Sequence, residues 1–343
     1  MKQLLNTLFV TTQGAYLHKE GASVIVTVEH QVVLRVPVHT LSGLICFGNV
    51  MCSPFLLAHC AEHGVAVSFL TENGRFLARV SGKISGNVLL RRQQYRAADD
   101  VDRSLNIARS MVIAKTANAR TVMQRAMRDH MEKPGMEQMT PAINRLGGIV
   151  QECMTAKSLD ELRGREGDAG REYFGIFKHL IAVQKESFMF AERSRRPPLD
   201  PVNALLSFVY VLLAHDCVGA LEGVGLDPQV GFLHRDRPGR SSLALDLMEE
   251  FRAFFADRLV LSLINLRQVS SKGFKRTESG AVEMNEDTRK AVLVAYQKRK
   301  QDEIKHPFLN ETMPIGMLMH AQALLLARHL RGDLDGYPAF IWK

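Results

Sequence analysis

The hydrophobic pattern of the chain changes its period once, at a segment that contains glycine and serine and spans residues 81–86. Before this segment, apolar and β-branched residues recur in short runs separated by turn residues, which is typical of strands. Beyond it, apolar residues recur every three to four positions, which is typical of helices. We therefore predict an α+β protein with a small β-rich domain at residues 1–85 and a larger, mostly α-helical domain at residues 86–343.

Six runs in the N-terminal domain have the length and composition of strands. They occupy residues 7–12, 23–28, 32–36, 44–47, 65–70 and 75–80. Between the last two runs, Asn73-Gly74 is a strong hairpin signal, because both residue types tolerate the positive φ angles of a tight turn. The domain is therefore expected to contain hairpins.

One helix is predicted within this β-rich domain. Ser53-Pro54 reads as a capping residue followed by proline at the first helical position, and Gly64 closes the helix. His59, Cys60 and His63 on this helix are residue types that bind zinc. Because no further ligand is evident in the sequence, we interpret these three as packing and surface residues.

The C-terminal domain is helical by its pattern from residue 87 to about residue 130 and again beyond. A capping box, Ser158 to Glu161, introduces a segment with glycines at positions 164, 167 and 170. Each glycine weakens an isolated helix by roughly 1 kcal/mol relative to alanine. We therefore expect these glycines to permit the close approach of another helix or of a phosphate backbone.

Nothing in the sequence indicates membrane insertion or export. The longest apolar run, residues 204–214, is about half of what a membrane-spanning helix needs, and we expect it to form a buried central helix. The N-terminus lacks the pattern of a cleaved signal. The five cysteines are odd in number and scattered, which suits free thiols in a reducing compartment. We expect a soluble, cytoplasmic protein without a disulfide framework.

The segment 231–250 contains the residue types of a metal site. His234 ends a short apolar run, and after a turn a helix begins that carries Asp246, Glu249 and Glu250. Helical residues three or four apart have Cβ atoms about 5–6 Å apart, so two such carboxylates can share one cation. The apolar residues of 243–260 fall on the opposite side, so we predict one continuous helix with a solvent-facing acidic side. A solvated acidic face without a metal is the alternative interpretation.

Positive charge is clustered along the chain. The formal net charge is +8, and the isoelectric point is about 9.3. Clusters of arginine and lysine are the electrostatic footprint of a protein that binds a polyphosphate backbone, although each cluster alone is also compatible with a solvated surface. The candidate DNA-binding residues are Arg91, Arg92, Arg96, Arg193, Arg195, Arg196, Lys272, Lys275 and Arg276.

Three motifs behind the β-rich domain make the chain resemble a known family. They are GREGDAGREYF, RRPPLDPVNALLSFVY and GLDPQVGFLHRDRPGRSSLALDLMEEFR. In this order they resemble the CRISPR-associated spacer-acquisition integrase family, Cas-one, and the resemblance covers nearly the whole chain. It implies an N-terminal β-domain and a C-terminal helical domain that carries a divalent metal site.

Matched residue by residue, the resemblance implies that Glu166, His234 and Glu249 are the metal ligands and the catalytic residues. In some relatives the last ligand is an aspartate, so Asp246 and Glu250 stay open as additional or supporting ligands. Two carboxylates and one imidazole form a mostly oxygen site that suits Mg²⁺ or Mn²⁺. Such an ion neutralises the charge that builds on a phosphodiester oxygen during in-line displacement.

The resemblance further implies a metal-dependent DNA endonuclease and integrase that serves antiviral CRISPR adaptation. It would insert prespacer DNA into the CRISPR array by attack of a 3′-hydroxyl on a phosphodiester, and it would also cleave DNA. The implied partners are double-stranded DNA, as prespacer and as repeat, the Cas-two protein, and a second copy of the chain in a homodimer formed through the β-domains, with no membrane involved. Two alternatives stay open, a general metal-dependent repair nuclease and a non-catalytic DNA-binding scaffold.

Overall fold

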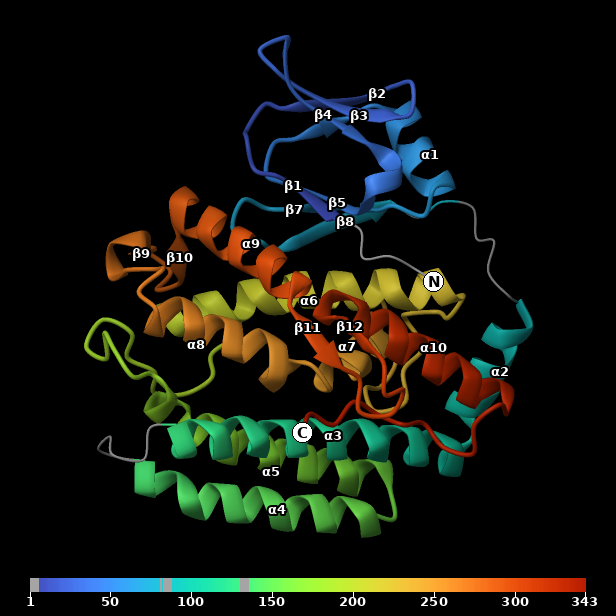
Figure 1. Ribbon diagram of the computed structural model, residues 1–343, viewed down its shortest axis with the longest axis vertical. Coiled ribbons are helices and arrows are strands. Elements are labelled where there is room, and N and C mark those ends of the chain that lie inside the picture. The colour runs from blue at the N-terminus through green and yellow to red at the C-terminus, as the bar shows by residue number, and fades with distance from the viewer. Residues whose placement is uncertain (1–5, 81, 83–87, 130–135) are drawn as a thin grey trace. The chain divides into compact units, whose positions relative to one another are not determined.

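The structure is a computed structural model of the chain, and it describes residues 6–80, 82, 88–129 and 136–343. The chain forms two compact units, Met1–Gly86 and Asn87–Lys343 (Figure 1). The first unit is rich in strands and the second is mostly helical. The predicted α+β class, with a β-rich region ahead of a helical region, is confirmed. Of the segment 81–86 that we interpreted as a linker, all but Gly82 lies outside the described residues.

The N-terminal unit consists of two four-stranded sheets and one helix. Its elements are β1 (Asn6–Val10), β2 (Tyr16–Glu20), β3 (Ser23–Val28), β4 (Gln31–Pro37), the 3₁₀ turn η1 (Val38–Thr40), β5 (Leu41–Phe47), β6 (Met51–Cys52), α1 (Pro54–Glu62), β7 (Ala66–Leu70) and β8 (Phe76–Val80). One sheet has the order β1-β5-β7-β8, in which the first three strands are parallel; the other has the order β4-β3-β2-β6. One apolar cluster, which includes Leu17, Leu44, Leu56 and Val67, joins both sheets to the helix.

All six predicted strand runs of this unit correspond to strands. The Asn73-Gly74 turn connects β7 to β8, and Gly74 has a φ of +84°. The strands β2 and β6 were not predicted. The first reads YLHKE, in which polar residues outnumber apolar ones, and the second has only two residues. Neither carries enough apolar alternation to be detected by pattern.

Helix α1 begins and ends where the sequence predicts. Ser53 Oγ accepts a hydrogen bond from Leu56 N at 3.2 Å, and Pro54 is the first helical residue. Gly64 follows the helix with a φ of +69°, a conformation that glycine adopts without strain. Leu56 and Cys60 belong to the apolar cluster, so this side of α1 is anchored to the sheets.

The C-terminal unit is an assembly of helices with two short antiparallel strand pairs. Its helices are α2 (Val88–Asp99), α3 (Val101–Asp129), α4 (Met139–Thr155), α5 (Leu159–Ile176), α6 (Pro201–Val224), α7 (Ser242–Glu249), the π-helical segment η4 (Arg252–Asp257), α8 (Arg258–Asn265), α9 (Glu286–Gln301) and α10 (Leu318–Arg331). Its 3₁₀ turns are η2 (Met136–Gln138), η3 (Phe177–Leu180), η5 (Ser271–Gly273) and η6 (Ile315–Met317). The strand pairs are β9 (Phe274–Arg276) with β10 (Val282–Met284) and β11 (Glu303–Lys305) with β12 (Thr312–Pro314). Helices α3, α4 and α5 pack against one another (Figure 1).

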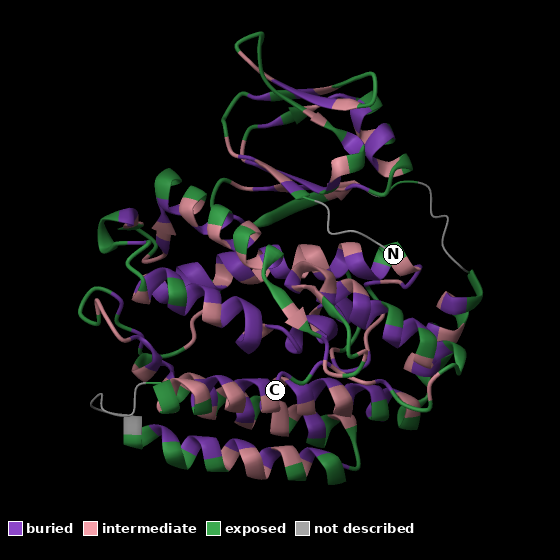
Figure 2. Cartoon of the chain, viewed as in Figure 1, coloured by how far each residue is buried: buried purple, intermediate pink, exposed green. Residues whose placement is uncertain are grey.

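Helix α6 is the core helix of this unit. Asp200 Oδ1 accepts a hydrogen bond from Asn203 N at 2.8 Å, and Pro201 occupies the first helical position. By length and composition alone, α6 is long and apolar enough to cross a membrane, but 56% of its apolar window is buried inside the protein. It packs against α7 and α10 and is mostly buried in Figure 2, as expected for the central helix of a folded unit.

The helical pattern predicted from residue 87 to about residue 130 corresponds to two helices, α2 and α3. Asp100 lies between them, and its Oδ1 accepts hydrogen bonds from Asp102 N and Arg103 N, each at 3.0 Å. A capping aspartate starts a new helix and satisfies its free N–H groups. The apolar period continues across this break, so the pattern did not detect it.

The continuous helix predicted for residues 243–260, with carboxylates facing solvent, is wrong. The helix α7 ends at Glu249, the π-helical segment η4 follows, and α8 begins at Arg258. Asp246, Glu249 and Glu250 are each at most 1% exposed. Charged groups are buried at this level only when they are paired, so the partners of these carboxylates define the site.

The C-terminal tail docks on its own unit. The rings of Phe340 and Trp342 each lie 5.1 Å from the ring of Phe254, and the guanidinium of Arg125 lies 3.9 Å from the centre of the Trp342 ring. Asn118 on α3 binds the tail twice, since its Nδ2 donates to Phe340 O at 2.9 Å and its Oδ1 accepts from Trp342 N at 2.7 Å. The tail is therefore part of the core.

Candidate active site

Glu249, at the end of α7, is buried among positive charges. Its Oε1 lies 3.1 Å from Arg252 Nη1, and its Oε2 lies 2.8 Å from Lys115 Nζ. Burial alone would raise the pKa of Glu249, but the charges of Arg252, Lys115 and His234 lower the pKa to about 2. The carboxylate is therefore ionised at neutral pH. Among the described residues, the ion pair with Lys115 is the contact that the structure gives for Oε2.

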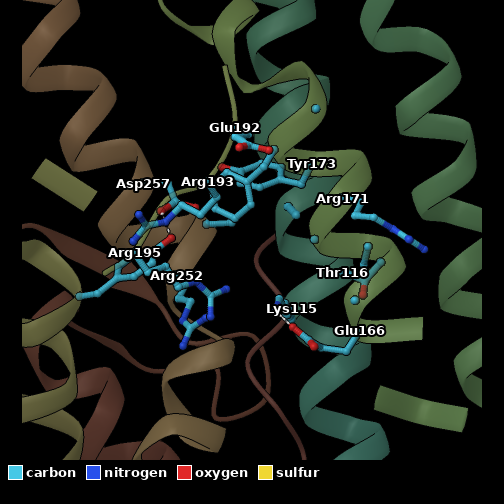
Figure 3. Close-up of a pocket in the computed structure, with 18 of the residues that line it drawn as sticks. Lys115, Thr116, Glu166, Arg171, Tyr173, Glu192, Arg193, Arg195, Arg252 and Asp257 are labelled. Atoms are coloured by element: carbon cyan, nitrogen blue, oxygen red, sulfur yellow. Dashed lines mark hydrogen bonds and ion pairs between the residues drawn. The ribbon is translucent and has the colours of Figure 1, made fainter. Parts of the chain in front are cut away.

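Lys115 connects Glu249 to Glu166. Lys115 lies on α3 and Glu166 on α5, and these two side chains form an ion pair (Figure 3). The same ammonium also forms an ion pair with Glu249. Burial would lower the pKa of Lys115, but the charges of Glu249 and Glu166 raise it above its usual value, so the amine stays protonated. One cation thus lies between two carboxylates that come from distant segments of the chain.

Asp246 holds His234 in a fixed orientation. Its Oδ1 lies 2.6 Å from Nδ1 of His234, and the carboxylate also accepts hydrogen bonds from the backbone N–H groups of Phe232, Leu233 and His234 at 2.6–3.0 Å. A side chain would not fit at Gly231, because its Cβ would lie 2.7 Å from Asp246 Oδ2. With Nδ1 directed at a carboxylate, Nε2 of the histidine is left for a ligand. Asp246 therefore supports the histidine, and its oxygens are used within the protein.

Both oxygens of Glu250 bind the C-terminal tail. Its Oε2 accepts hydrogen bonds from Gln322 Nε2 at 2.9 Å and from Phe340 N at 2.6 Å, and the Tyr337 hydroxyl donates to Oε1. Burial raises the pKa of Glu250 to about 7, and these three hydrogen bonds oppose the rise. The structure therefore gives Glu250 a structural role in docking the tail.

Glu166, His234 and Glu249 bring two carboxylates and one imidazole to one region of the C-terminal unit. His234 lies near enough to Glu249 to interact with it electrostatically, and Lys115 joins Glu249 to Glu166. The ligand atoms of these three residues are not all within 4.8 Å of one another. Among the residues that the structure describes, the one group of three metal-binding side chains that is this close lies in the N-terminal unit. The Lys115 ammonium is the positive charge that lies between the two carboxylates. Two carboxylates and one imidazole are ligand types that suit Mg²⁺ or Mn²⁺.

A cavity of about 400 Å³ extends from the pair of Lys115 and Glu166 (Figure 3). Gly167 and Gly170 of α5 belong to its wall. A Cβ added at either of them, or at Gly164, would meet no atom within 4 Å. Within the part of the chain that the structure describes, no helix therefore packs directly on these three glycines, although α3 lines the same cavity. The open face leaves room for a ligand backbone.

Arg193 and Arg195 belong to the lining of the same cavity. Arg193 donates hydrogen bonds to Asn203 Oδ1 at 2.6 Å and to Ser207 Oγ at 3.1 Å, so it ties the loop before α6 to that helix. Burial lowers the pKa of Arg193, yet an arginine remains charged at neutral pH. Arg195 is exposed. Of these two predicted DNA-binding residues, Arg193 is thus held by hydrogen bonds within the protein, whereas Arg195 is exposed and can contact a ligand.

The other predicted DNA-binding residues lie outside the lining of this cavity. Those that are exposed are Arg92, Arg96, Arg196, Lys272, Lys275 and Arg276, whereas Arg91 is half-buried. Strands β9 and β10 form a short antiparallel hairpin that carries Lys275 and Arg276. Arg276 Nη2 donates to Leu199 O at 3.2 Å, which attaches this hairpin to the loop that precedes α6.

Lys115 and Arg252 were not predicted as site residues. Lys115 lies within the apolar run MVIAKTAN of a buried helix, and Arg252 follows Glu249 by three positions. A lysine in the middle of an apolar helical face needs a buried partner, because an isolated buried charge is costly. That signal was present in the sequence, but it does not name the partner.

Residues 8–298 match the family described as CRISPR associated protein Cas1. The chain belongs to the Cas1 family. A Chlorobaculum tepidum protein named CRISPR-associated endonuclease Cas1 1 is 54% identical over 343 residues, which is the full length of both chains. A Rhodospirillum rubrum protein named CRISPR-associated endonuclease Cas1 2 is 50% identical over 347 residues, again at 100% of both. The family that the three motifs indicated is therefore confirmed, and this Cas1 protein is a member of an endonuclease family.

Solved structures share the fold of this Cas1 protein. A casposase bound to integration product aligns with a TM-score of 0.85 and 24% identity, over 99% of this chain and 95% of the other. A Cas1 protein from Thermotoga maritima aligns with a TM-score of 0.81 and 23% identity, over 96% and 97%. A chain of a Cas6-RT-Cas1–Cas2 complex aligns with a TM-score of 0.84 and 21% identity, over 100% of this chain and 36% of the other. At these identities the likeness shows the fold alone.

Proposed function

We propose that this Cas1 protein is a metal-dependent DNA endonuclease and integrase of CRISPR adaptation. The observation that carries the proposal is the meeting of Glu166 and Glu249 at one cation, the Lys115 ammonium, in the same region as a histidine that a carboxylate orients. Its relatives are named endonucleases, and the similarly folded casposase was solved with an integration product. In integration, the 3′-oxygen of a prespacer forms a bond to a phosphorus of the repeat while one existing phosphorus–oxygen bond breaks. One phosphodiester replaces another, so no outside energy source is needed.

Glu166, His234 and Glu249 are the residues proposed to hold Mg²⁺ or Mn²⁺. When bound, such an ion neutralises charge on the phosphodiester oxygens and orients the attacking oxygen. Arg252 and Lys115 keep Glu249 ionised. Asp246 fixes the ring of His234 through Nδ1, so that Nε2 is the nitrogen offered to the ion.

Lys115 changes its partner in this proposal. While the Lys115 ammonium and the Arg252 guanidinium balance the two glutamates, the site carries no uncompensated negative charge. Once both carboxylates bind a divalent ion, the ammonium is free to bind the nearest phosphate oxygen, because its side chain lines the cavity and is 15% exposed. The glycine face of α5 gives a sugar–phosphate backbone room to approach, and Arg195 adds positive charge to the same cavity.

The proposed macromolecular partners are double-stranded DNA, as prespacer and CRISPR repeat, and the Cas2 protein. Chains of similar fold come from a Cas6-RT-Cas1–Cas2 complex and from a casposase with an integration product. The exposed arginines and lysines of the C-terminal unit supply the charge that DNA binding requires. All five cysteines are free thiols, which fits a reducing cytoplasm.

A homodimer is proposed through the N-terminal unit. Strand β4 lies at the edge of its sheet, and it exposes Val32 and Val33 at 58% each and Leu34 at 41%. An exposed edge strand with apolar side chains is a template for pairing with another chain. A second copy of the same strand would satisfy the free N–H and C=O groups of this edge.

Strand joining is the test that separates this proposal from its alternatives. The protein with its Cas2 partner is incubated with a duplex that has free 3′-hydroxyls and with a supercoiled target that contains the repeat. We expect covalently joined products with Mg²⁺ or Mn²⁺, and none with EDTA or with 3′-dideoxy ends. A repair nuclease would give cut DNA without joined products, and a scaffold would bind DNA and leave it intact. Either result would contradict the integrase proposal.

The basic hairpin β9–β10 is expected to contact phosphates. Replacing Lys272 and Lys275 with glutamine should weaken duplex binding for all sequences alike, because a phosphate contact carries no sequence information. The slope of log K against log salt should become shallower by about 0.9 for each phosphate that is no longer neutralised. Both quantities are measured by fluorescence anisotropy over a salt series.

Lys290→Gln on α9 is the matched control for the hairpin variant, because Lys290 is an exposed lysine outside the basic clusters. It should leave the affinity and the salt slope unchanged. If the hairpin variant loses binding to one sequence only, its lysines read bases and the phosphate assignment is wrong.

A further inference from the structure

The end of helix α1 carries a cluster of metal-binding side chains that the proposed integrase site does not use. His59, Glu62 and His63 form the sequence pattern H-x-x-E-H. Each offers one ligand atom, and these three atoms lie within 4.8 Å of one another. The two histidines are four positions apart, so one helical turn places them on the same side. Their ring centres are 4.2 Å apart.

His63 has a free ring nitrogen of the kind that metals bind. Its Nδ1 lies 2.9 Å from the backbone oxygen of His59. A carbonyl oxygen only accepts hydrogen bonds, so Nδ1 carries the proton and the lone pair is on Nε2. Metal-binding histidines commonly donate their second N–H to a backbone carbonyl in this way, which fixes the orientation of the ring.

His59 offers a second free nitrogen, and it is buried. The residue is 8% exposed, and its Nε2 has no hydrogen-bond partner among the residues that the structure describes. A buried polar atom without a partner is unfavourable, so a bound ligand at this nitrogen would relieve that cost. Burial, aided by the charges of Lys19 and His63, lowers the pKa of His59, so at neutral pH the ring is in the uncharged state that binds metals.

Glu62 completes the donor set and Cys60 does not. Glu62 is exposed beside the two histidines. Cys60 is buried in the apolar cluster of the N-terminal unit, and burial raises the pKa of its thiol to about 11. The sequence grouped Cys60 with the two histidines as zinc-binding types. In the structure, the third metal-binding group beside the two histidines is the carboxylate of Glu62 and not the thiol of Cys60.

We propose that His59, Glu62 and His63 form a binding site for Zn²⁺, separate from the proposed integrase site. Two imidazoles and one carboxylate favour zinc over the hard ions Mg²⁺ and Mn²⁺. Tetrahedral zinc, with bonds of about 2.0–2.2 Å, places its ligand atoms about 3.3–3.5 Å apart. The three ligand atoms lie within 4.8 Å of one another, and the exposed side chain of Glu62 is free to rotate toward the two imidazoles. The fourth position is left to water or to a group from a partner.

This zinc site would hold the end of α1 against the sheets. The helix packs on β2 and β7. His59 is buried next to Cys60, which belongs to the apolar cluster of this unit. Bound zinc would join this buried face to the exposed last turn. Since zinc binds only the folded unit, it should raise the thermal unfolding temperature of the protein.

The test is Zn²⁺ binding to the full-length, chelator-treated protein by isothermal titration calorimetry. His63→Gln and Glu62→Gln are the informative variants, because both side chains are exposed and their replacement leaves the core intact. His63→Gln should remove one equivalent of bound zinc together with the upward shift of the unfolding temperature. Glu62→Gln should weaken that equivalent by about 10–100-fold. The exposed His39 supplies the control, and His39→Gln should change neither quantity.

The same titrations are repeated with Glu166→Gln and His234→Gln together, so that the two sites are measured apart. The proposal predicts that the equivalent removed by His63→Gln persists in this double variant. If zinc binding disappears only in the double variant, the N-terminal cluster binds no zinc and the proposal is wrong. If it disappears only in His63→Gln, the zinc site stands and the proposed integrase site binds no zinc.

Discussion

Glu166→Gln is expected to abolish metal-dependent DNA cleavage and strand joining while leaving the fold intact. The substitution keeps the size of the side chain and removes its charge, so the cation loses one of its two carboxylates. Loss of one group that stabilises transition-state charge lowers rates by on the order of 10²–10³-fold. Because Glu166 is 29% exposed, its ion pair with Lys115 contributes no more than about 1 kcal/mol to the free energy of unfolding. Duplex affinity should be retained.

Cleavage and joining by this variant are followed on gels with labelled DNA, duplex affinity by anisotropy, and stability by thermal unfolding. Glu172→Gln is the matched control, because Glu172 lies on the same helix and outside the cavity lining. It should keep full activity. Full activity in Glu166→Gln would remove this glutamate from the site. Loss of activity together with a much lower unfolding temperature would point to a structural role instead.

Glu250→Ala is expected to destabilise the C-terminal unit by about 3–5 kcal/mol. The substitution leaves the hydroxyl of Tyr337 and the backbone N–H of Phe340 without their acceptor in a buried site, and the amide of Gln322 loses one of its acceptors. Breaking one side of a buried polar network costs this much because the remaining groups are neither solvated nor paired. At about 2–4 °C per kcal/mol, the unfolding midpoint should fall by roughly 6–20 °C.

Chemical denaturation of Glu250→Ala, Gln322→Ala and the double variant measures this network. If the residues act together, the double variant should lose less stability than the sum of the two single variants. Glu303→Ala, at an exposed glutamate of β11, is the control and should stay within about 0.5 kcal/mol of the parent protein. A Glu250→Ala protein as stable as this control would show that the tail does not depend on the carboxylate.

Local signals in the sequence were sufficient to predict most helices and strands, but they did not reveal where one helix is interrupted and the next begins. The caps at Ser53 and Ser158 and the turn at Asn73-Gly74 depend on neighbouring residues only, so they were found. The break at Asp100 and the π-helical segment after α7 leave the apolar period almost unchanged, so pattern analysis passed over them. The strand YLHKE was missed because its stability comes from neighbouring strands on both sides.

The three acidic residues at the end of α7 were named from the sequence, but their partners in the fold were not. Asp246, Glu249 and Glu250 lie within five positions and look alike by pattern. The structure gives them three different partners, which are His234 for the first, Lys115 with Arg252 for the second, and the C-terminal tail for the third. These partners come from segments that are distant in the chain, so no spacing rule reveals them.

The amino-acid sequence by itself determined the order of the two units, most of their strands and helices, and the family to which the chain belongs. These features follow from hydrophobic period, caps and turns, which are properties of neighbouring residues. Only the tertiary structure decided that the acidic residues of α7 are buried and that Lys115 lies between Glu166 and Glu249. The reason is that the cost of burying a charge depends on which opposite charge the fold places next to it, and that neighbour is chosen by packing.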